Sequence, residues 1–107
     1  QLVFILQRGV RFPQGPPYSM SFFVYMLKSV NSVKFKTYVG FTNNIKLRVS
    51  KHNSNKGAKA TRGYKWVVIY SRKFKEKNAA MSFEYKLKKN RIQRSIILKD
   101  YLDEQRN

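Results

Sequence analysis

Two runs rich in β-branched and aromatic residues constrain the fold of this chain more than any other feature. They are SFFVYMLKS at residues 21–29 and KFKTYVGF at residues 34–41, and the short segment NSV lies between them. Such composition favours extended strands, and a short polar connection favours a turn. The sequence therefore predicts an antiparallel β-hairpin.

The next segments predict a helix, a loop and a third strand. Thr42 or Asn43 can cap a helix over roughly 44–53, in which Ile45 and Val49 share one face. Residues 52–63 are rich in Gly, Asn, Ser and Lys, which predicts a loop. The segment KWVVIYS at 65–71 is apolar enough to be the central strand of a sheet.

Two helices complete the predicted domain. Asn78 can cap the first of them, and Asn90 interrupts the pattern before a final amphipathic helix. The fold class is therefore α+β, a three-stranded antiparallel sheet flanked by helices in the order β-β-α-β-α-α over residues 21–107. The apolar positions of the two helices are Ala79, Ala80, Phe83 and Leu87, then Ile92, Ile96, Ile97, Leu98, Tyr101 and Leu102.

Residues 1–20 differ in composition from this domain. They hold all three prolines, together with Arg8 and Arg11 and no acidic residue. Proline disfavours regular structure, so an extended basic arm is predicted. A leader, the remnant of a targeting sequence, and an arm that docks on RNA or on a protein subunit all fit this composition.

The charge balance identifies the class of partner. The chain has 23 Lys and Arg against 5 Asp and Glu, a formal net charge of +18. Such a field favours a nucleic acid, DNA or structured RNA. No apolar run reaches the roughly 18 residues of a membrane-spanning helix, so a membrane is not expected. The absence of cysteine excludes a disulfide framework and fits an intracellular protein of the cytoplasm, the nucleoid or a mitochondrion.

The few carboxylates narrow the possible metal ligands. None occurs in the first 75 residues, and Asp100, Asp103 and Glu104 cluster near the C-terminus. Glu76 and Glu84 are thus the only acids in the body of the chain. Glu84 lies along the apolar stripe of the penultimate helix, and one carboxylate is enough to hold Mg²⁺, which retains several waters.

Four further side chains suit phosphodiester hydrolysis. Arg48 and His52 are four residues apart and project from one helix face, while Tyr25 and Tyr38 lie on the two hairpin strands and can approach each other. A guanidinium offers fixed charge stabilisation to a phosphoryl group. A phenol becomes a base where nearby cations favour the phenolate, and the positive surroundings predict such a shift.

In this order, Val24-Tyr25, Tyr38-Val39-Gly40, Arg48 with His52, and Glu84 resemble the GIY-YIG endonuclease domain. The resemblance covers about residues 21–100 and is strongest to the short stand-alone members and to related structure-specific nuclease subunits. The loop KGAKATRG at 56–63 is similar to a segment of the short members. The first motif here lacks its glycine.

The resemblance implies a role for each matching position. Tyr25 and Tyr38 would position or activate the attacking water, and Gly40 would let backbone and phosphate come close. Arg48 would stabilise the phosphoryl charge, and His52 would assist proton transfer or contact the substrate. In this family the single carboxylate, which here is Glu84, holds one Mg²⁺ or Mn²⁺ ion.

Simpler interpretations of the same residues also exist. The tyrosines suit ordinary strand aromatics, His52 next to the Lys- and Asn-rich loop is expected at an exposed helix end, and Glu84 can pair with Lys88. The basic residues of this region are expected to contact the nucleic-acid backbone. They are Lys46, Lys51, Lys56, Lys59, Arg62 and Lys65.

Two functional hypotheses follow. The first, which we favour because the full Tyr, Tyr, Arg and Glu set is present, is a metal-dependent endonuclease acting on DNA. The second is a domain derived from such a nuclease that binds RNA without cutting it, as a subunit of a ribosome-like, possibly mitochondrial, assembly. The net charge of +18 suits the second hypothesis.

Overall fold

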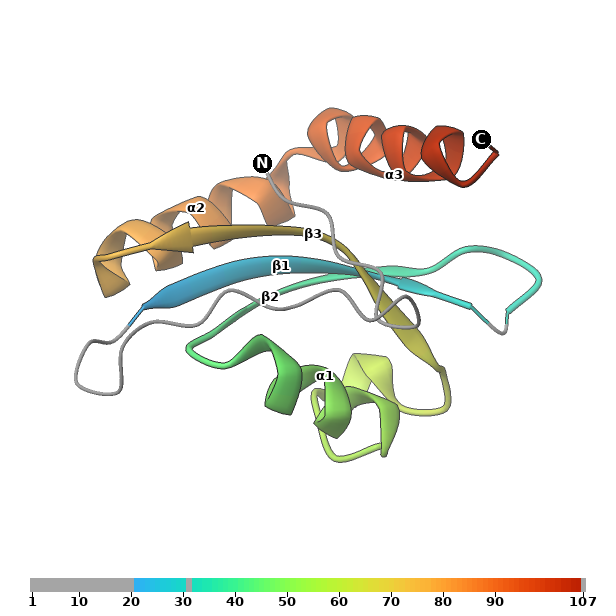
Figure 1. Ribbon diagram of the computed structural model, residues 1–107, viewed down its shortest axis with the longest axis horizontal. Helices are drawn as coiled ribbons and strands as arrows, with labels where there is room; N and C mark the ends of the chain where they lie inside the picture. Colours follow the sequence, from blue (N-terminus) through green and yellow to red (C-terminus); the bar gives the residue numbers. More distant parts are fainter. Residues whose placement is uncertain (1–20, 31, 107) are drawn as a thin grey trace.

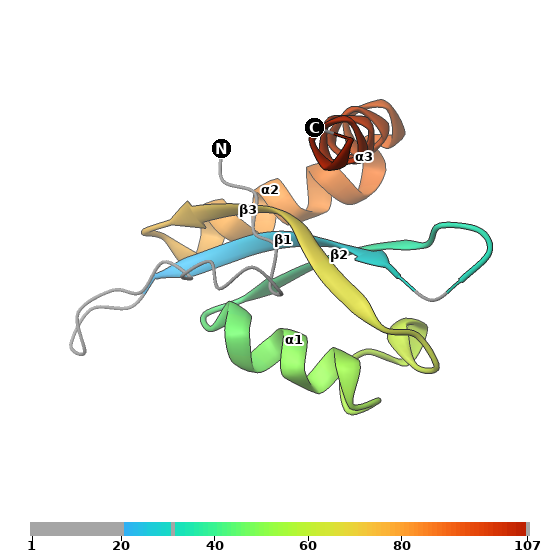
Figure 2. The same ribbon diagram turned by 45° about the vertical axis from the view of Figure 1, so that its right-hand side comes forward.

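The structure is a computed structural model that describes residues 21–30 and 32–106. Within these residues a three-stranded antiparallel sheet has helix α1 on one face and helices α2 and α3 on the other (Figures 1 and 2). The predicted α+β class and element order are therefore confirmed, whereas the predicted arm at 1–20 lies outside the described residues. The elements are β1 (Phe22–Ser29), β2 (Thr37–Thr42), α1 (Ile45–Asn53), the short 3₁₀ helix η2 (Lys59–Thr61), β3 (Trp66–Phe74), α2 (Lys77–Lys89) and α3 (Arg91–Gln105).

The strand order is β2-β1-β3, so β1 is the central strand. The prediction that residues 65–71 form the central strand is wrong: β3 is an edge strand. Its apolar character has another cause, because helices cover both of its faces. Val68 packs in a cluster with residues of α1, and Ile69 packs in a cluster with residues of α2 and α3.

Alternation along β1 assigns its side chains to two separate cores. Val24 and Met26 face α2 and α3, whereas Tyr25 and Leu27 face α1. All four are fully buried. The first core also contains Val39, Val67, Ile69, Tyr70, Ala80, Leu87, Ile97 and Tyr101, and the second also contains Phe23, Ile45, Val49, Trp66 and Val68.

The hairpin is confirmed, although β2 begins at Thr37 and not at residue 34. Ladder pairing between β1 and β2 ends at Lys28 and Thr37. Beyond that pair, the Ser29 backbone N–H donates to the Lys36 carbonyl (2.9 Å), and the Ser29 hydroxyl accepts from the Lys36 N–H (2.9 Å). These bonds close a wider loop than the predicted three-residue turn.

The predicted start of α1 shifts by one position. Asn44 is the cap, because its Oδ1 accepts from the Leu47 N–H at 3.0 Å. The Thr42 hydroxyl, one of the two predicted caps, accepts instead from the Asn44 N–H at 3.1 Å. The predicted shared face of Ile45 and Val49 is confirmed, since both are buried.

The start of α3 agrees with the prediction, whereas the start of α2 does not. Helix α2 begins at Lys77 after Glu76, so Asn78 lies inside the helix and is not its cap. Asn90 does end α2 as predicted, and it caps α3 by accepting the Gln93 N–H at 3.0 Å. Of the predicted apolar positions, Ala79, Ile92 and Ile96 are exposed.

Gly40 lies directly opposite Tyr25 in the β1–β2 ladder. A Cβ atom at Gly40 would stand 2.3 Å from the Tyr25 hydroxyl oxygen and 2.4 Å from Cζ of the ring. Tyr25 is fully buried and has no room to move aside. The structure thus gives this glycine a packing role beneath the phenol, in addition to the expected approach of a phosphate.

We expect Gly40→Ala to lower the free energy of unfolding by about 1–3 kcal/mol, because the added methyl overpacks a closed core. Urea denaturation of purified protein measures this change. Thr37→Ala, at an exposed position of the same strand, is the matched control. Equal stability of the two variants would contradict the packing role.

Candidate active site

The centre of the candidate site is a buried hydrogen bond between β1 and α1. The hydroxyl oxygen of Tyr25 lies 2.8 Å from Nε2 of His52, and neither side chain is exposed to solvent. The expectation that His52 sits at an exposed helix end is therefore wrong. Ile45, Val49 and His52 follow one another at helical spacing, so the imidazole continues the face of α1 that packs against the sheet.

The loop at 56–63 encloses the other side of the imidazole. Nδ1 of His52 lies 2.9 Å from the hydroxyl of Thr61, which is itself fully buried. A Cβ atom at Gly57 would come within 2.5 Å of the same nitrogen, so only glycine fits there without displacing the ring. From the sequence, this loop was predicted to contact the nucleic-acid backbone, whereas the contacts of Gly57 and Thr61 with His52 were not predicted.

Tyr38 packs beside both members of the buried pair. Its ring centroid is 6.4 Å from that of Tyr25 and 5.0 Å from that of His52. The predicted approach of the two tyrosines is therefore present, although Tyr38 pairs in the ladder with Leu27 and reaches Tyr25 diagonally. Tyr38 is half-buried, so it is the phenol that is open to solvent.

Both members of the buried pair are neutral at pH 7. Burial raises the pKa of Tyr25 to about 12 and outweighs Arg48, whose hydrogen bond and positive charge lower it. The predicted shift of this phenol towards the phenolate is thus wrong, since loss of hydration costs more than the cation contributes. Burial, with the Arg48 charge as the second cause, lowers the pKa of His52 from 6.5 to about 4.

Arg48 lies on α1 one turn before His52, and the N–H donors of its guanidinium are only partly hydrogen-bonded. Its Nε atom is buried and has no hydrogen-bond partner. A buried donor without a partner is unfavourable, and an anion bound there would satisfy it. Because Nε is closed to solvent in this structure, a phosphoryl oxygen could take this place next to Tyr25 only after the guanidinium turns outward.

Glu84 lies on α2, which packs on the opposite face of the sheet from α1. Its side chain is 21% exposed and forms the predicted ion pair with Lys88 at 3.3 Å. Its negative charge also reaches Tyr25 and contributes, as the smallest of the causes, to raising the pKa of that phenol. The structure brings the other four predicted residues together and leaves Glu84 at their margin.

The oxygen and nitrogen donors near Glu84 determine which divalent cation this side chain could hold. Within the described part of the chain, no group of three or more His, Cys, Asp and Glu side chains could hold a metal ion. One partly exposed carboxylate fits Mg²⁺, which keeps several waters and needs only one or two protein carboxylates. The residues present therefore fit a largely hydrated ion at Glu84.

The six basic residues predicted to contact a nucleic-acid backbone are all exposed on α1 and the following loop. Lys65 also donates to the Asn53 carbonyl at 2.7 Å. Sequence reasoning missed a further basic group, since Tyr38 lines an open hollow together with Lys88 and Arg94. Among the described residues, no helix has both the length and the apolar character needed to cross a membrane.

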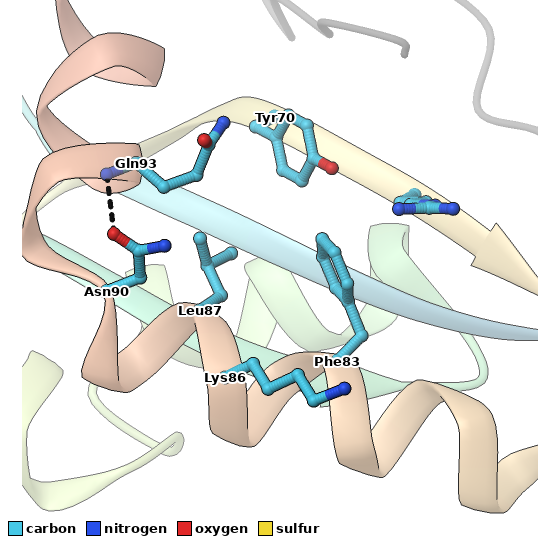
Figure 3. Close-up of a pocket in the computed structure, with 7 residues that line it drawn as sticks. Tyr70, Phe83, Lys86, Leu87, Asn90 and Gln93 are labelled. Atoms are coloured by element: carbon cyan, nitrogen blue, oxygen red, sulfur yellow. Dashed lines mark hydrogen bonds between the residues drawn. The ribbon is translucent and has the colours of Figure 1, made fainter.

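A second pocket lies on the α2 and α3 face of the sheet and includes none of the predicted site residues (Figure 3). Asn90 lines it, and its Oδ1 accepts the Gln93 N–H, so this side chain is engaged as the cap of α3. The residues that line the pocket are Tyr70, Arg72, Phe83, Lys86, Leu87, Asn90 and Gln93.

The chain is similar to a described catalytic-domain family and to short viral and bacterial proteins. A family model described as the GIY-YIG catalytic domain matches residues 21–95. The chain is 40% identical over 85 residues to an uncharacterized protein of Acanthamoeba polyphaga mimivirus, covering 71% of this chain and 50% of that protein. It is 40% identical over 67 residues to a UPF0213 protein of Oceanobacillus iheyensis, covering 62% of this chain and 74% of the relative. The solution NMR structure of a UPF0213 protein from Bacillus halodurans is 31% identical, with a TM-score of 0.42 and coverage of 76% and 84%.

The buried histidine predicts a specific loss of stability in acid. The folded state resists protonation of His52 until about pH 4, whereas the unfolded chain takes up that proton near pH 6.5. The unfolded state therefore binds more protons between these values, and the stabilisation present above pH 6.5 is lost as the pH falls. We expect the free energy of unfolding to drop by about 2 kcal/mol between pH 7.5 and pH 5.

Urea denaturation across this pH range measures the loss. The His52→Gln variant should show little pH dependence there, because His52 is the single histidine of the chain and few carboxylates are present. A wild-type protein whose stability is flat from pH 7.5 to pH 5 would contradict the burial of His52.

Proposed function

The chain belongs to the GIY-YIG catalytic-domain family, and from that premise we propose that it is a divalent-metal-dependent endonuclease that hydrolyses phosphodiester bonds of DNA. The observation that carries this proposal is the buried Tyr25–His52 hydrogen bond beside an incompletely paired arginine. The pair places two acid–base groups next to a side chain that can bind phosphate, an arrangement that cleavage uses and that backbone binding alone does not require.

In this proposal Tyr25 and His52 move the proton of the attacking water. The phenol oxygen accepts that proton while its own proton passes to Nε2 of His52, over a contact of 2.8 Å. The hydroxide so formed bonds to phosphorus as the ester P–O bond breaks, and the leaving oxygen takes a proton from solvent water. Because both groups are neutral at pH 7, the two transfers occur together and no separate phenolate has to form. Positioned acid–base groups of this kind contribute about 10²- to 10⁴-fold to rate.

Arg48 is assigned to the scissile phosphate. The Nε atom that lacks a partner would bind a phosphoryl oxygen, and the guanidinium would offset the charge that develops there. The negative charge of the phosphate would in turn favour protonation of His52, which the nearby Arg48 charge opposes when no substrate is bound. Substrate binding would thus make His52 a better proton acceptor.

Glu84 is the residue that would hold the cation. A bound Mg²⁺ or Mn²⁺ would supply charge stabilisation to the transition state. Tyr38, the partly exposed phenol, would orient the incoming phosphate at the entrance to the buried pair. Access of water to the Tyr25 oxygen requires that the Tyr38 ring turns aside as the substrate binds, because Tyr25 is fully buried.

A non-catalytic RNA-binding role is the second candidate. The observation that favours it is the net charge of +18 on 107 residues, which exceeds what cleavage chemistry needs. The exposed lysines of α1 and the loop serve either role, because phosphate contacts position a protein on DNA or RNA without reading sequence. A cleavage assay separates the two roles.

We expect Glu84→Gln to lower Mg²⁺-dependent cleavage by about 10²-fold or more while salt-sensitive binding persists, because the variant loses its metal ligand and keeps every positive charge. The assay follows labelled linear duplex, branched DNA and structured RNA, with Mg²⁺ compared with EDTA. Lys88→Ala is the matched control, since it breaks the same ion pair and leaves the carboxylate in place.

Equal activity of Glu84→Gln and Lys88→Ala would show that the carboxylate serves only the ion pair. Tight, metal-independent binding of RNA by the wild type, with no cutting of any substrate, would overturn the nuclease in favour of the RNA-binding role.

A further inference from the structure

We propose that Thr61 is a positioning residue that sets the tautomer of His52 and thereby leaves Nε2 free to accept the proton of Tyr25. This inference rests on the proposed nuclease function, which needs a proton acceptor at that nitrogen. It follows from the direction of three consecutive hydrogen bonds, none of which can be reversed alone.

The chain of hydrogen bonds begins at the backbone carbonyl of Ala58, which can only accept. The Thr61 hydroxyl lies 2.7 Å from the Ala58 carbonyl oxygen and therefore donates to it. A hydroxyl has one proton, so towards His52 the same oxygen can act only as an acceptor. The 2.9 Å contact between Thr61 Oγ1 and His52 Nδ1 is then a bond donated by Nδ1–H.

The remaining contacts follow from this assignment. A neutral imidazole has one N–H, so with the proton on Nδ1 the nitrogen Nε2 offers a lone pair. The Tyr25 hydroxyl must be the donor in its 2.8 Å bond to Nε2. When the phenol proton moves across, both ring nitrogens become donors, and Thr61 and the Tyr25 oxygen already stand in place to accept them.

Two hydrogen bonds hold the backbone of Thr61, and a further pair holds Trp66, which makes one of them. Its backbone N–H donates to the Ala58 carbonyl at 3.0 Å, and its carbonyl accepts from Nε1 of Trp66 at 2.9 Å. The Asn53 side chain, at the end of α1, binds both the N–H and the carbonyl of Trp66 (2.6 and 3.1 Å). This support leaves the threonine little freedom to rotate away, as a positioning role requires.

The same short loop exposes Lys56, Lys59 and Arg62 to the solvent. Gly57 and Thr61 cradle the imidazole from within the segment that carries these charges. The motif at 56–63 therefore combines two tasks, with its basic side chains facing the nucleic acid and its small and hydroxyl residues holding the proton acceptor.

The test uses NMR on the whole protein, with wild type, Thr61→Val and Thr61→Ser. Because the chain contains a single histidine, long-range ¹H–¹⁵N correlations of the imidazole report its tautomer without assignment of other residues. The wild type and Thr61→Ser are expected to have the proton on Nδ1. Thr61→Val, which keeps the shape and removes the hydroxyl, is expected to place it on Nε2.

Single-turnover cleavage of the best substrate gives the second measurement. Thr61→Val is expected to be slower by about 10²- to 10⁴-fold, with Thr61→Ser near the wild type and with unchanged substrate binding by both. A wild type protonated on Nε2, or a Thr61→Val variant still protonated on Nδ1, would overturn the assignment. If the wild type cuts nothing, the proposed function fails, whereas the spectra of the wild type and the variants still decide the tautomer.

Discussion

The hydrogen bond between Tyr25 and His52 is the constraint on which the rest of this structure depends. Two polar side chains are placed inside an apolar face of the sheet, where a donor or acceptor without a partner costs about 1–3 kcal/mol. The neighbouring residues remove that cost. Gly40 makes room for the phenol, Gly57 makes room for the imidazole, and Thr61 takes up the second ring nitrogen. Tyr25, His52 and Thr61 therefore form a closed network in which each of the three is satisfied.

The fold separates this neutral interior from a strongly positive exterior. Strand β1 is central and carries Tyr25 on the α1 side, while its alternate residues form a second core under α2 and α3. The basic side chains of α1 and of the loop lie outside the buried pair. A phosphate drawn to that surface would reach Arg48, whose buried Nε still lacks a partner, at the boundary between the two environments.

Local sequence patterns predicted the helices and strands. They did not predict the features that depend on contacts between residues far apart in the chain. The hairpin, the three helices and the break at Asn90 follow from periodicity and capping signals that need no tertiary information. The edge position of β3 did not follow, because helices on both faces make an edge strand as apolar as a central one. The burial of His52 was missed because one polar residue on a short helix is ambiguous by composition. Thr61 was missed because its partner is nine residues away across a loop.

Single-turnover cleavage by Tyr25→Phe, compared with the wild type at saturating Mg²⁺, is the most direct test of the proposed proton relay. The substitution removes one oxygen, the only atom that joins the attacking water to His52 in the proposed relay. Tyr85→Phe, at an exposed position on α2, is the matched control. If the relay operates, Tyr25→Phe binds substrate normally and cuts it about 10²-fold more slowly or worse, with Tyr85→Phe unaffected. Cleavage by Tyr25→Phe at the wild-type rate would contradict the central role given to the buried pair.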